Sequence, residues 1–178
     1  MPTYVAFLRG INVGGHNRMT MDDLRALVAS LGYDDVRTYI QSGNVVFEAA
    51  EADSDSLAAE LHAAIEVEFG YDVTVMVRTR KELEAVVDGQ PFDVPGTEGV
   101  RHYVTFLEDE PRGDGIDALQ DAALEGETFE VVGRTVYSRL DKTVMPDGRS
   151  TDAGTKLGVS ATRRNWDVVT SVLEVTRG

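Results

Sequence analysis

The order of short apolar runs and amphipathic helical patterns over the first 78 residues constrains the fold of this chain most strongly. Short runs rich in β-branched and aromatic residues indicate strands, two of them joined by a three-residue polar turn that predicts a hairpin. Apolar residues at helical spacing indicate two helices, the first with Thr20 as N-cap and Gly32 at its end. The order strand, helix, strand, strand, helix, strand is the split βαβ pattern of a ferredoxin-like unit. The predicted strands are 4–8, 36–40, 44–48 and 73–77, and the predicted helices are 20–31 and 57–69.

The second half of the chain repeats this pattern in part. Tyr-Val-Thr-Phe-Leu at 103–107 echoes Tyr-Val-Ala-Phe-Leu at 4–8, and a helical pattern and a predicted hairpin follow it. The match then weakens, because a C-terminal helix beginning at Thr162 is expected with no clear final strand. We therefore predict an α+β fold with two tandem ferredoxin-like halves (split βαβ, or alpha-beta plait), each with an antiparallel sheet. The expected divisions are a first half at 1–78, a short helix and linker loop at 79–99, and a second half ending in a C-terminal helix at 100–178.

Charge and composition narrow the function classes. The formal net charge of −14 argues against coating nucleic acid through bulk electrostatics. The chain has no cysteine, which excludes disulfides and cysteine-ligated metals and favours a reducing compartment. It has no secretory apolar segment and no apolar run near the length of about 18 residues that spans a membrane. We expect a cytoplasmic protein without membrane association, whose oligomeric state the sequence leaves open.

The most unusual composition lies at residues 8–18, Leu-Arg-Gly-Ile-Asn-Val-Gly-Gly-His-Asn-Arg, between the first strand and the first helix. In a split βαβ sheet the end of the first strand lies beside the start of the third, so this loop is expected next to residues 41–44. The first helix also begins there, and its free N–H groups favour an anion. We interpret the loop as a binding loop; the alternative is that its glycines serve turn geometry and Arg9 pairs with an acidic side chain.

The expected ligand contacts divide by chemistry. Planar guanidinium or imidazole groups would contact negative charge, amide and hydroxyl groups would orient the ligand, and glycine backbone would lie close to it. His16 is the only candidate for a general acid or base near the loop. The loop lacks the lysine and hydroxyl of a P-loop and the dinucleotide fingerprint, and no cofactor is predicted. These candidates are Arg9, His16 and Arg18 for charge, Asn12, Ser42 and Asn44 for hydrogen bonds, and the backbone of Gly14 and Gly15.

A second arginine-rich segment lies at 162–166. With Thr162 as N-cap, Arg163 and Arg164 fall in a first helical turn, where positive charge is disfavoured. An anionic ligand or a nearby acid such as Asp167 would compensate, and the sequence does not choose between them. Arg163, Arg164 and Asn165 are therefore further ligand-binding candidates, whereas Trp166 is expected in the core.

No metal site is predicted. The three histidines are scattered, and no zinc or EF-hand spacing occurs. His62 and Glu66, four residues apart on the second predicted helix, are expected to form a solvated pair.

The segments 8–15 (Leu-Arg-Gly-Ile-Asn-Val-Gly-Gly), 39–45 (Tyr-Ile-Gln-Ser-Gly-Asn-Val) and 162–166 (Thr-Arg-Arg-Asn-Trp) together resemble the bacterial domain-of-unknown-function 1697 family. The resemblance covers nearly the whole chain. It implies a duplicated fold of two ferredoxin-like halves in a cytosolic protein, and it implies no activity. It also selects the same segments as the physical interpretation.

The sequence therefore favours a protein that binds a small anionic ligand, phosphate-bearing or nucleotide-like, at residues 9–18, as an enzyme or as a sensor. Nucleic acid is not the expected partner: a single-stranded nucleic-acid module is the alternative, and it needs exposed aromatic residues on central strands and a basic stripe. A partner-binding structural protein is the third possibility.

Overall fold

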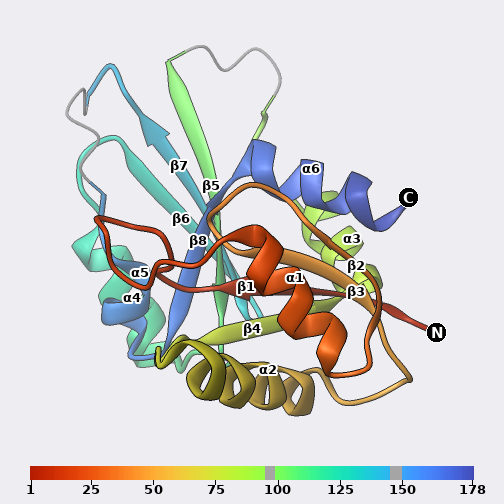
Figure 1. Cartoon of the computed structure of the whole chain (residues 1–178). Helices are drawn as coiled ribbons and strands as arrows, with labels where there is room; N and C mark the ends of the chain where they lie inside the picture. Colours follow the sequence, from red (N-terminus) through yellow and green to blue (C-terminus); the bar gives the residue numbers. More distant parts are fainter. Residues whose placement is uncertain (95–98, 145–149) are drawn as a thin grey trace. The chain divides into compact units, whose positions relative to one another are not determined.

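The computed structural model describes residues 1–94, 99–144 and 150–178. The chain forms two compact units (Figure 1), a first unit of Met1–Ala85 with Thr170–Gly178 and a second unit of Val86–Val169. These bounds set the last nine residues with the first unit, whereas the sequence analysis assigns the whole C-terminal helix to the second half. In the described residues, no helix combines the length and the apolar character needed to cross a membrane.

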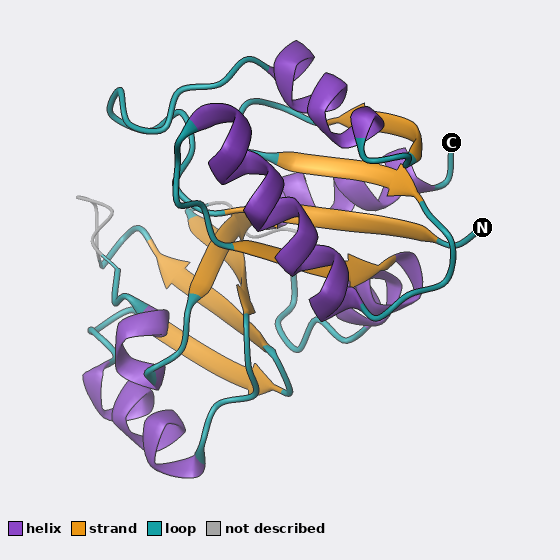
Figure 2. Ribbon diagram, turned by 60° about the horizontal axis from the view of Figure 1, so that its bottom comes forward, coloured by secondary structure: helices purple, strands orange, loops and turns teal. Residues whose placement is uncertain are grey.

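The first unit contains a four-stranded antiparallel sheet in the order β2-β3-β1-β4. Two helices, α1 and α2, cover one face of this sheet (Figure 2), and α3 follows the last strand. The strands are β1 (Thr3–Leu8), β2 (Asp34–Thr38), β3 (Asn44–Glu48) and β4 (Val75–Thr79), and the helices are α1 (Met21–Ser30), α2 (Ser54–Phe69) and α3 (Arg80–Asp88). This is the predicted split βαβ unit.

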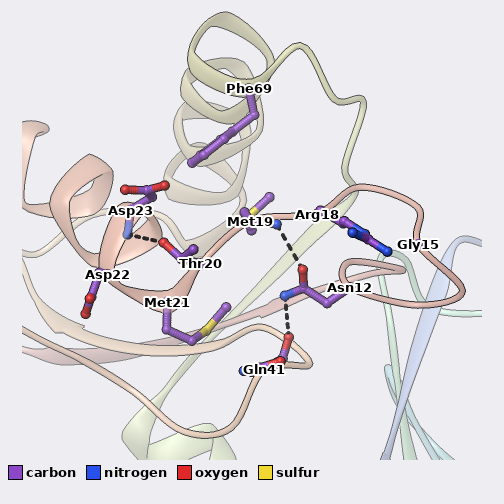
Figure 3. Close-up of a pocket in the computed structure, with 10 residues that line it drawn as sticks. All are labelled: Asn12, Gly15, Arg18, Met19, Thr20, Met21, Asp22, Asp23, Gln41 and Phe69. Carbon is purple, nitrogen blue, oxygen red and sulfur yellow. Dashed lines mark hydrogen bonds between the residues drawn. The ribbon is translucent and has the colours of Figure 1, made fainter.

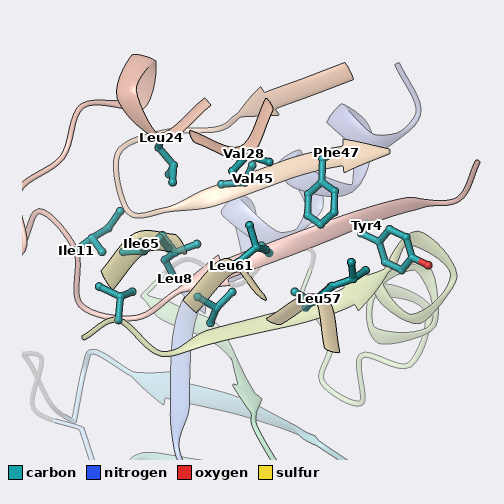
Figure 4. Close-up of a cluster of buried hydrophobic side chains, with 14 of the residues drawn as sticks. Tyr4, Leu8, Ile11, Leu24, Val28, Val45, Phe47, Leu57, Leu61 and Ile65 are labelled. Carbon is teal, nitrogen blue, oxygen red and sulfur yellow. The ribbon is translucent and has the colours of Figure 1, made fainter. Parts of the chain in front are cut away.

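Alternation along the strands places one set of side chains against the two helices (Figure 4). Tyr4, Leu8 and Phe47 belong to this core with apolar residues of both helices, and each large apolar side chain buried there contributes about 1.5–3 kcal/mol. Val5 and Phe7, which point to the opposite face of the sheet, are fully buried as well. Burial on both faces explains why residues 4–8 are continuously apolar instead of alternating with polar residues.

The second unit has the same topology, with the strand order β6-β7-β5-β8. Its core joins strand residues such as Leu107 and Val136 to Leu119 and Leu157 of the two helices that follow β5 and β7. The tandem ferredoxin-like fold is thus confirmed. The strands are β5 (Val100–Leu107), β6 (Glu127–Val132), β7 (Thr135–Asp141) and β8 (Ala161–Asn165), and the helices are α4 (Gly113–Ala122), α5 (Ala153–Leu157) and α6 (Trp166–Thr176).

The prediction for residues 162–166 is wrong. Thr162 is not an N-cap, and Arg163 and Arg164 are not in a helical turn, because these residues form β8 and pair with β5 in the register Phe106↔Thr162 and Val104↔Arg164. Burial alternates along β8, with Thr162 and Arg164 buried and Arg163 exposed, as expected for a strand. Strand pairing outweighs the local capping signal here. The helix-dipole argument for a ligand at the two arginines therefore no longer applies.

The helix before this strand, α5, has no clear signal in the sequence. The helix α5 has only five residues and contains Gly154, so it is too short to show a helical stripe. A Cβ at Gly154 would lie 2.9 Å from the Cβ of Ala161, which requires glycine where α5 approaches β8. With α5 and β8 the second unit completes the same element order as the first.

Candidate functional site

The loop between β1 and α1 folds into a miniature hairpin. The His16 N–H donates to the Val13 carbonyl at 2.9 Å, and the Asn12 N–H donates to the Asn17 carbonyl at 3.2 Å. Gly14 and Gly15, at φ 57° and 80°, form the two-residue tip. Two successive left-handed residues are the signature of a tight primed turn, which glycine adopts without steric cost. The glycine-rich composition therefore has a structural cause in addition to any functional one.

Asn12 joins this loop to two other segments. Its Nδ2 donates to the Gln41 carbonyl at 2.9 Å, and its Oδ1 accepts from the Met19 N–H at 2.9 Å. The Leu8 N–H also donates to the Gly43 carbonyl at 2.9 Å. The loop and the turn at 41–44 therefore lie side by side, as the strand order requires.

Ser42 and Asn44 hold this neighbouring turn in shape. Asn44 is completely buried, and its Nδ2 donates to the Tyr39 carbonyl at 2.9 Å and to the Ser42 Oγ at 3.0 Å. Gly43 sits between them at φ 89°. The Asn44 amide is thus oriented toward the protein backbone, and we assign Asn44 to the support of the site.

A cavity of about 630 Å³ opens where the loop meets the start of α1 (Figure 3). The Arg18 guanidinium lies against Gly15, since a Cβ at Gly15 would be 3.4 Å from Arg18 Nη2. Met19, Met21 and Phe69 give the cavity an apolar surface. The residues that line it are Asn12, Gly15, Arg18, Met19, Thr20, Met21, Asp22, Asp23, Gln41 and Phe69.

Charge is distributed unevenly in this cavity. Arg18 is the only cationic residue of the lining, and Asp22 and Asp23 lie on the opposite side of the view in Figure 3. Thr20 caps α1 by accepting from the Asp23 N–H at 3.0 Å, and Asp22 pairs with Arg25. The cap and the two carboxylates already complement the positive end of α1, so Arg18 is the group able to attract negative charge.

The predicted site residues fall into separate groups. Of those in the first unit, Asn12, Gly15 and Arg18 line the cavity, whereas Arg9, Gly14, His16, Ser42 and Asn44 do not. The side chains of Arg9 and His16 are exposed, and the Arg9 N–H donates to the Thr74 carbonyl at 2.9 Å. The cavity therefore gives no support to His16 as an acid or base.

Several lining residues were missed by the sequence analysis. Met19 and Met21 flank the predicted N-cap, and two apolar residues around a cap were the available signal. Phe69 ends the apolar stripe of α2 and packs against the core, so its sequence position does not distinguish it from a core residue. Gln41 carried no signal, because it enters the site only through the pairing of β1 with β3.

The predicted residues of the second segment lie in the second unit and have three different environments. Arg163 stacks over the Tyr103 ring at 4.2 Å and donates to Ser150 Oγ at 2.7 Å. Arg164 is buried and donates to Thr162 Oγ1 at 2.7 Å, and desolvation lowers the pKa of its guanidinium to about 10. Asn165 lines a second cavity of about 410 Å³.

One group of side chains has donor atoms suited to a cation. His62 Nε2 lies 3.3 Å from Asp72 Oδ1 and 3.9 Å from Glu66 Oε2, and its Nδ1 contacts the Val73 carbonyl at 2.7 Å. The expected pairing of His62 with Glu66 is therefore present, and Asp72 is an addition that only the chain reversal after α2 brings close. Exposed groups of this kind are common without an ion, and we assign this one as an ion-pair cluster.

The fold defines the class of this protein: it is an α+β protein of two tandem ferredoxin-like units, and a cavity lies at its β1–α1 loop. Residues 1–137 match the family model described as a protein of unknown function (DUF1697), and the chain belongs to this family. The match includes the loop at 8–15 and the turn at 39–45, and the segment at 162–166 lies beyond it.

Among solved structures, the chain is similar to the conserved bacterial protein SP0830 from Streptococcus pneumoniae. The two share 19% sequence identity with a TM-score of 0.78, over 98% of each chain. This likeness concerns the fold. No curated protein matches the chain.

Proposed function

We propose that this protein binds a small amphipathic anion in the cavity between the β1–α1 loop and the start of α1. The observation that carries the proposal is the combination of a single arginine at one end of the cavity with an apolar surface made by Met19, Met21 and Phe69. The cavity volume falls within the range of about 300–1,000 Å³ that is typical of small-molecule sites.

The chemistry of the lining specifies the ligand class. Arg18 would contact a phosphate or carboxylate group by charge-assisted hydrogen bonds, close to the backbone of Gly15. An apolar or planar body, such as the base of a nucleotide-like compound, would rest on the two methionines and Phe69. Asp22 and Asp23 would repel a second anionic group at the other end and would accept from hydroxyl or amino groups there. The best fit is a molecule with one anionic end and one donor-rich end.

Binding without turnover is the favoured activity. The lining contains no histidine, lysine or serine. Its groups capable of proton transfer or nucleophilic attack are Thr20, which caps α1, Asp22, which pairs with Arg25, and Asp23. Asn12 and Gln41 belong to two segments tied by a hydrogen bond, so an occupied cavity would stabilise the contact between loop and turn. A sensor or carrier role follows from that coupling.

The two alternatives differ in their support. A single-stranded nucleic-acid module needs an accessible sheet face, and burial of the central strands β1 and β3 argues against it. The partner-binding alternative has one observation in its favour. Val13 and Ile40, exposed to 63% and 48%, are apolar side chains on the two segments that Asn12 joins.

Two broader proposals accompany this one. The absence of cysteine and the lack of any membrane-spanning helix among the described residues support a cytoplasmic location. The shared topology of the units, with Arg78 opposite Val5 and Arg164 opposite Val104, supports their origin by internal duplication.

The test is a thermal-shift screen of nucleoside monophosphates, sugar phosphates and aromatic carboxylates on wild type, Arg18→Gln and Arg9→Gln. Arg9 is the matched control, because it is an exposed arginine of the same loop that does not line the cavity. A compound at a hundred times its Kd should stabilise wild type and Arg9→Gln by about 2.7 kcal/mol and should leave Arg18→Gln nearly unshifted. Equal shifts in all three proteins, or no shift with any compound, would refute the proposal.

A further inference from the structure

The second unit contains a cavity that the proposed function does not use. Its volume is about 410 Å³, and it lies where β5 begins, β7 and β8 end, and α6 starts. Its lining is more polar than that of the first cavity. The residues are Val94, Val100, Arg101, His102, Lys142, Asn165, Trp166 and Asp167.

His102 is the unusual member of this lining. The residue is only 7% exposed, and within residues 1–94, 99–144 and 150–178 neither of its ring nitrogens has a hydrogen-bond partner. Buried polar atoms are nearly always hydrogen-bonded, because an unmade hydrogen bond leaves their desolvation uncompensated. The ring of Phe92, 6.2 Å away between centroids, offers no conventional hydrogen-bond acceptor. Both ring nitrogens have almost no accessible surface, so a polar group in the cavity would supply the missing partner only after the ring turns toward it.

The charged residues around His102 indicate the charge of a group that would bind there. Arg101 and Lys142 line the cavity. Burial lowers the pKa of the His102 imidazole, and the positive charge of Arg139 lowers it further. Asp167 carries the opposite charge; it lies in the first turn of α6, where a carboxylate complements the positive end of the helix. The lining therefore carries one more positive than negative charge in a protein whose net charge is −14. A neutral imidazole also keeps one N–H able to donate to an oxygen.

We propose that this cavity is a second ligand site, which takes an oxyanion held by Arg101 and Lys142 with a hydrogen bond from His102. Phosphate and carboxylate groups share this chemistry, and Asn165 provides an amide that suits either. Trp166 forms one wall, so a planar group attached to the oxyanion would contact its indole ring. The site is independent of the cavity in the first unit, since no residue is common to the two linings.

The chain provides its own reporter, because Trp166 is the only tryptophan. The experiment is a titration of the full chain with inorganic phosphate, pyrophosphate and citrate at constant ionic strength, followed by Trp166 fluorescence. We expect a saturable change in wild type and a loss of affinity of about tenfold in Lys142→Gln and in Arg101→Gln, as for removal of one charge-assisted contact. Lys156→Gln and Arg112→Gln, which replace exposed cations elsewhere in the unit, should bind as wild type does. Comparison of the three titrants identifies whether phosphate or carboxylate is preferred.

A second measurement, made on wild-type protein, does not depend on whether the variants fold. In wild-type protein, the ring resonances of His102 should move with the same saturation curve as the fluorescence. Saturable binding that leaves these resonances unmoved, or that Lys156→Gln weakens as much as Lys142→Gln does, would overturn the proposal, and so would a response that never saturates. Arg18→Gln should not alter this titration, so failure at either cavity is distinguishable from failure at the other.

Discussion

Asn12 donates a hydrogen bond of 2.9 Å to the backbone carbonyl of Gln41, which lies 29 positions further along the chain. The same side chain accepts from the Met19 N–H, so one amide ties the β1–α1 loop to the β2–β3 turn and to the start of α1. Asn12 therefore holds together the segments that contribute Met19 and Gln41 to the cavity lining.

Replacing Asn12 should therefore loosen the site and lower stability. Asn12→Ala removes both hydrogen bonds and puts alanine, which adopts left-handed backbone less readily than asparagine, at φ 55°, so we expect stability to fall by about 1–3 kcal/mol. Asn12→Gly removes the same hydrogen bonds, but glycine adopts this backbone conformation without strain, so the loss of stability should be smaller. Urea denaturation of the two variants and wild type measures the difference, and equal stabilities of wild type and Asn12→Ala would contradict the structural role.

Substitution of Gly43 should destabilise the first unit strongly. A Cβ there would lie 2.8 Å from the Leu8 Cβ and 2.8 Å from Ile11 Cδ1, and φ is 89°. Gly43→Ala thus adds a clash to backbone strain, with an expected loss of about 2–4 kcal/mol.

Gly32→Ala is the matched control for this clash. Gly32 has a φ of 92° and open space around its Cα, so its substitution tests strain alone, at about 1 kcal/mol. If the two variants have the same melting temperature, the close approach at Gly43 is not a constraint.

His102 should make the protein sensitive to mild acid. Burial, and then Arg139, lowers the pKa of His102 below its ordinary value of 6.5. The unfolded chain therefore binds a proton at this position where the folded chain does not, so the free energy of unfolding falls as the pH drops below about 6.5. Denaturant unfolding from about pH 7.5 to 5 should show a smaller loss in His102→Gln than in wild type.

The control for this pH dependence is His16→Gln, because His16 is exposed on the loop hairpin. It should keep the wild-type slope of stability against pH. An unchanged slope in His102→Gln would show that other groups cause the acid sensitivity.

The end of α6 should depend on two arginines of the first unit. Arg37 donates to the Val175 carbonyl, and Arg80 donates to the Thr176 carbonyl at 3.4 Å. These bonds satisfy carbonyls that a helix end leaves without intrahelical partners. Arg37→Ala should therefore speed amide hydrogen exchange in the last turn of α6, whereas Arg177→Ala, which removes only an exposed pair with Glu174, should not. Equal exchange in both variants would exclude an anchoring role for Arg37.

Residues near one another in sequence carried most of the information on the first unit. The apolar run at 4–8, the cap at Thr20 and the stripe of α2 each express a local period, and the order of these elements admits few sheet topologies. The position of the glycine-rich loop next to residues 41–44 followed from the strand order alone. The sequence also predicts a ligand site at residues 9–18, and three of its candidate residues, Asn12, Gly15 and Arg18, line the first cavity.

Residues whose role depends on distant partners could not be assigned in this way. The segment 162–166 carries a helix-cap signal at Thr162. Only pairing with β5 makes residues 161–165 a strand, because ladder hydrogen bonds outweigh a single cap. Phe69 has the sequence pattern of a core residue, and only the packing of α2 in the first unit makes it line the cavity with Met19 and Met21. His102 immediately precedes the apolar run at 103–107, and its ring nitrogens lack hydrogen-bond partners because folding of the second unit buries them. Local periodicity thus specifies the elements, whereas the long-range packing of side chains decides which polar groups are left to meet a ligand.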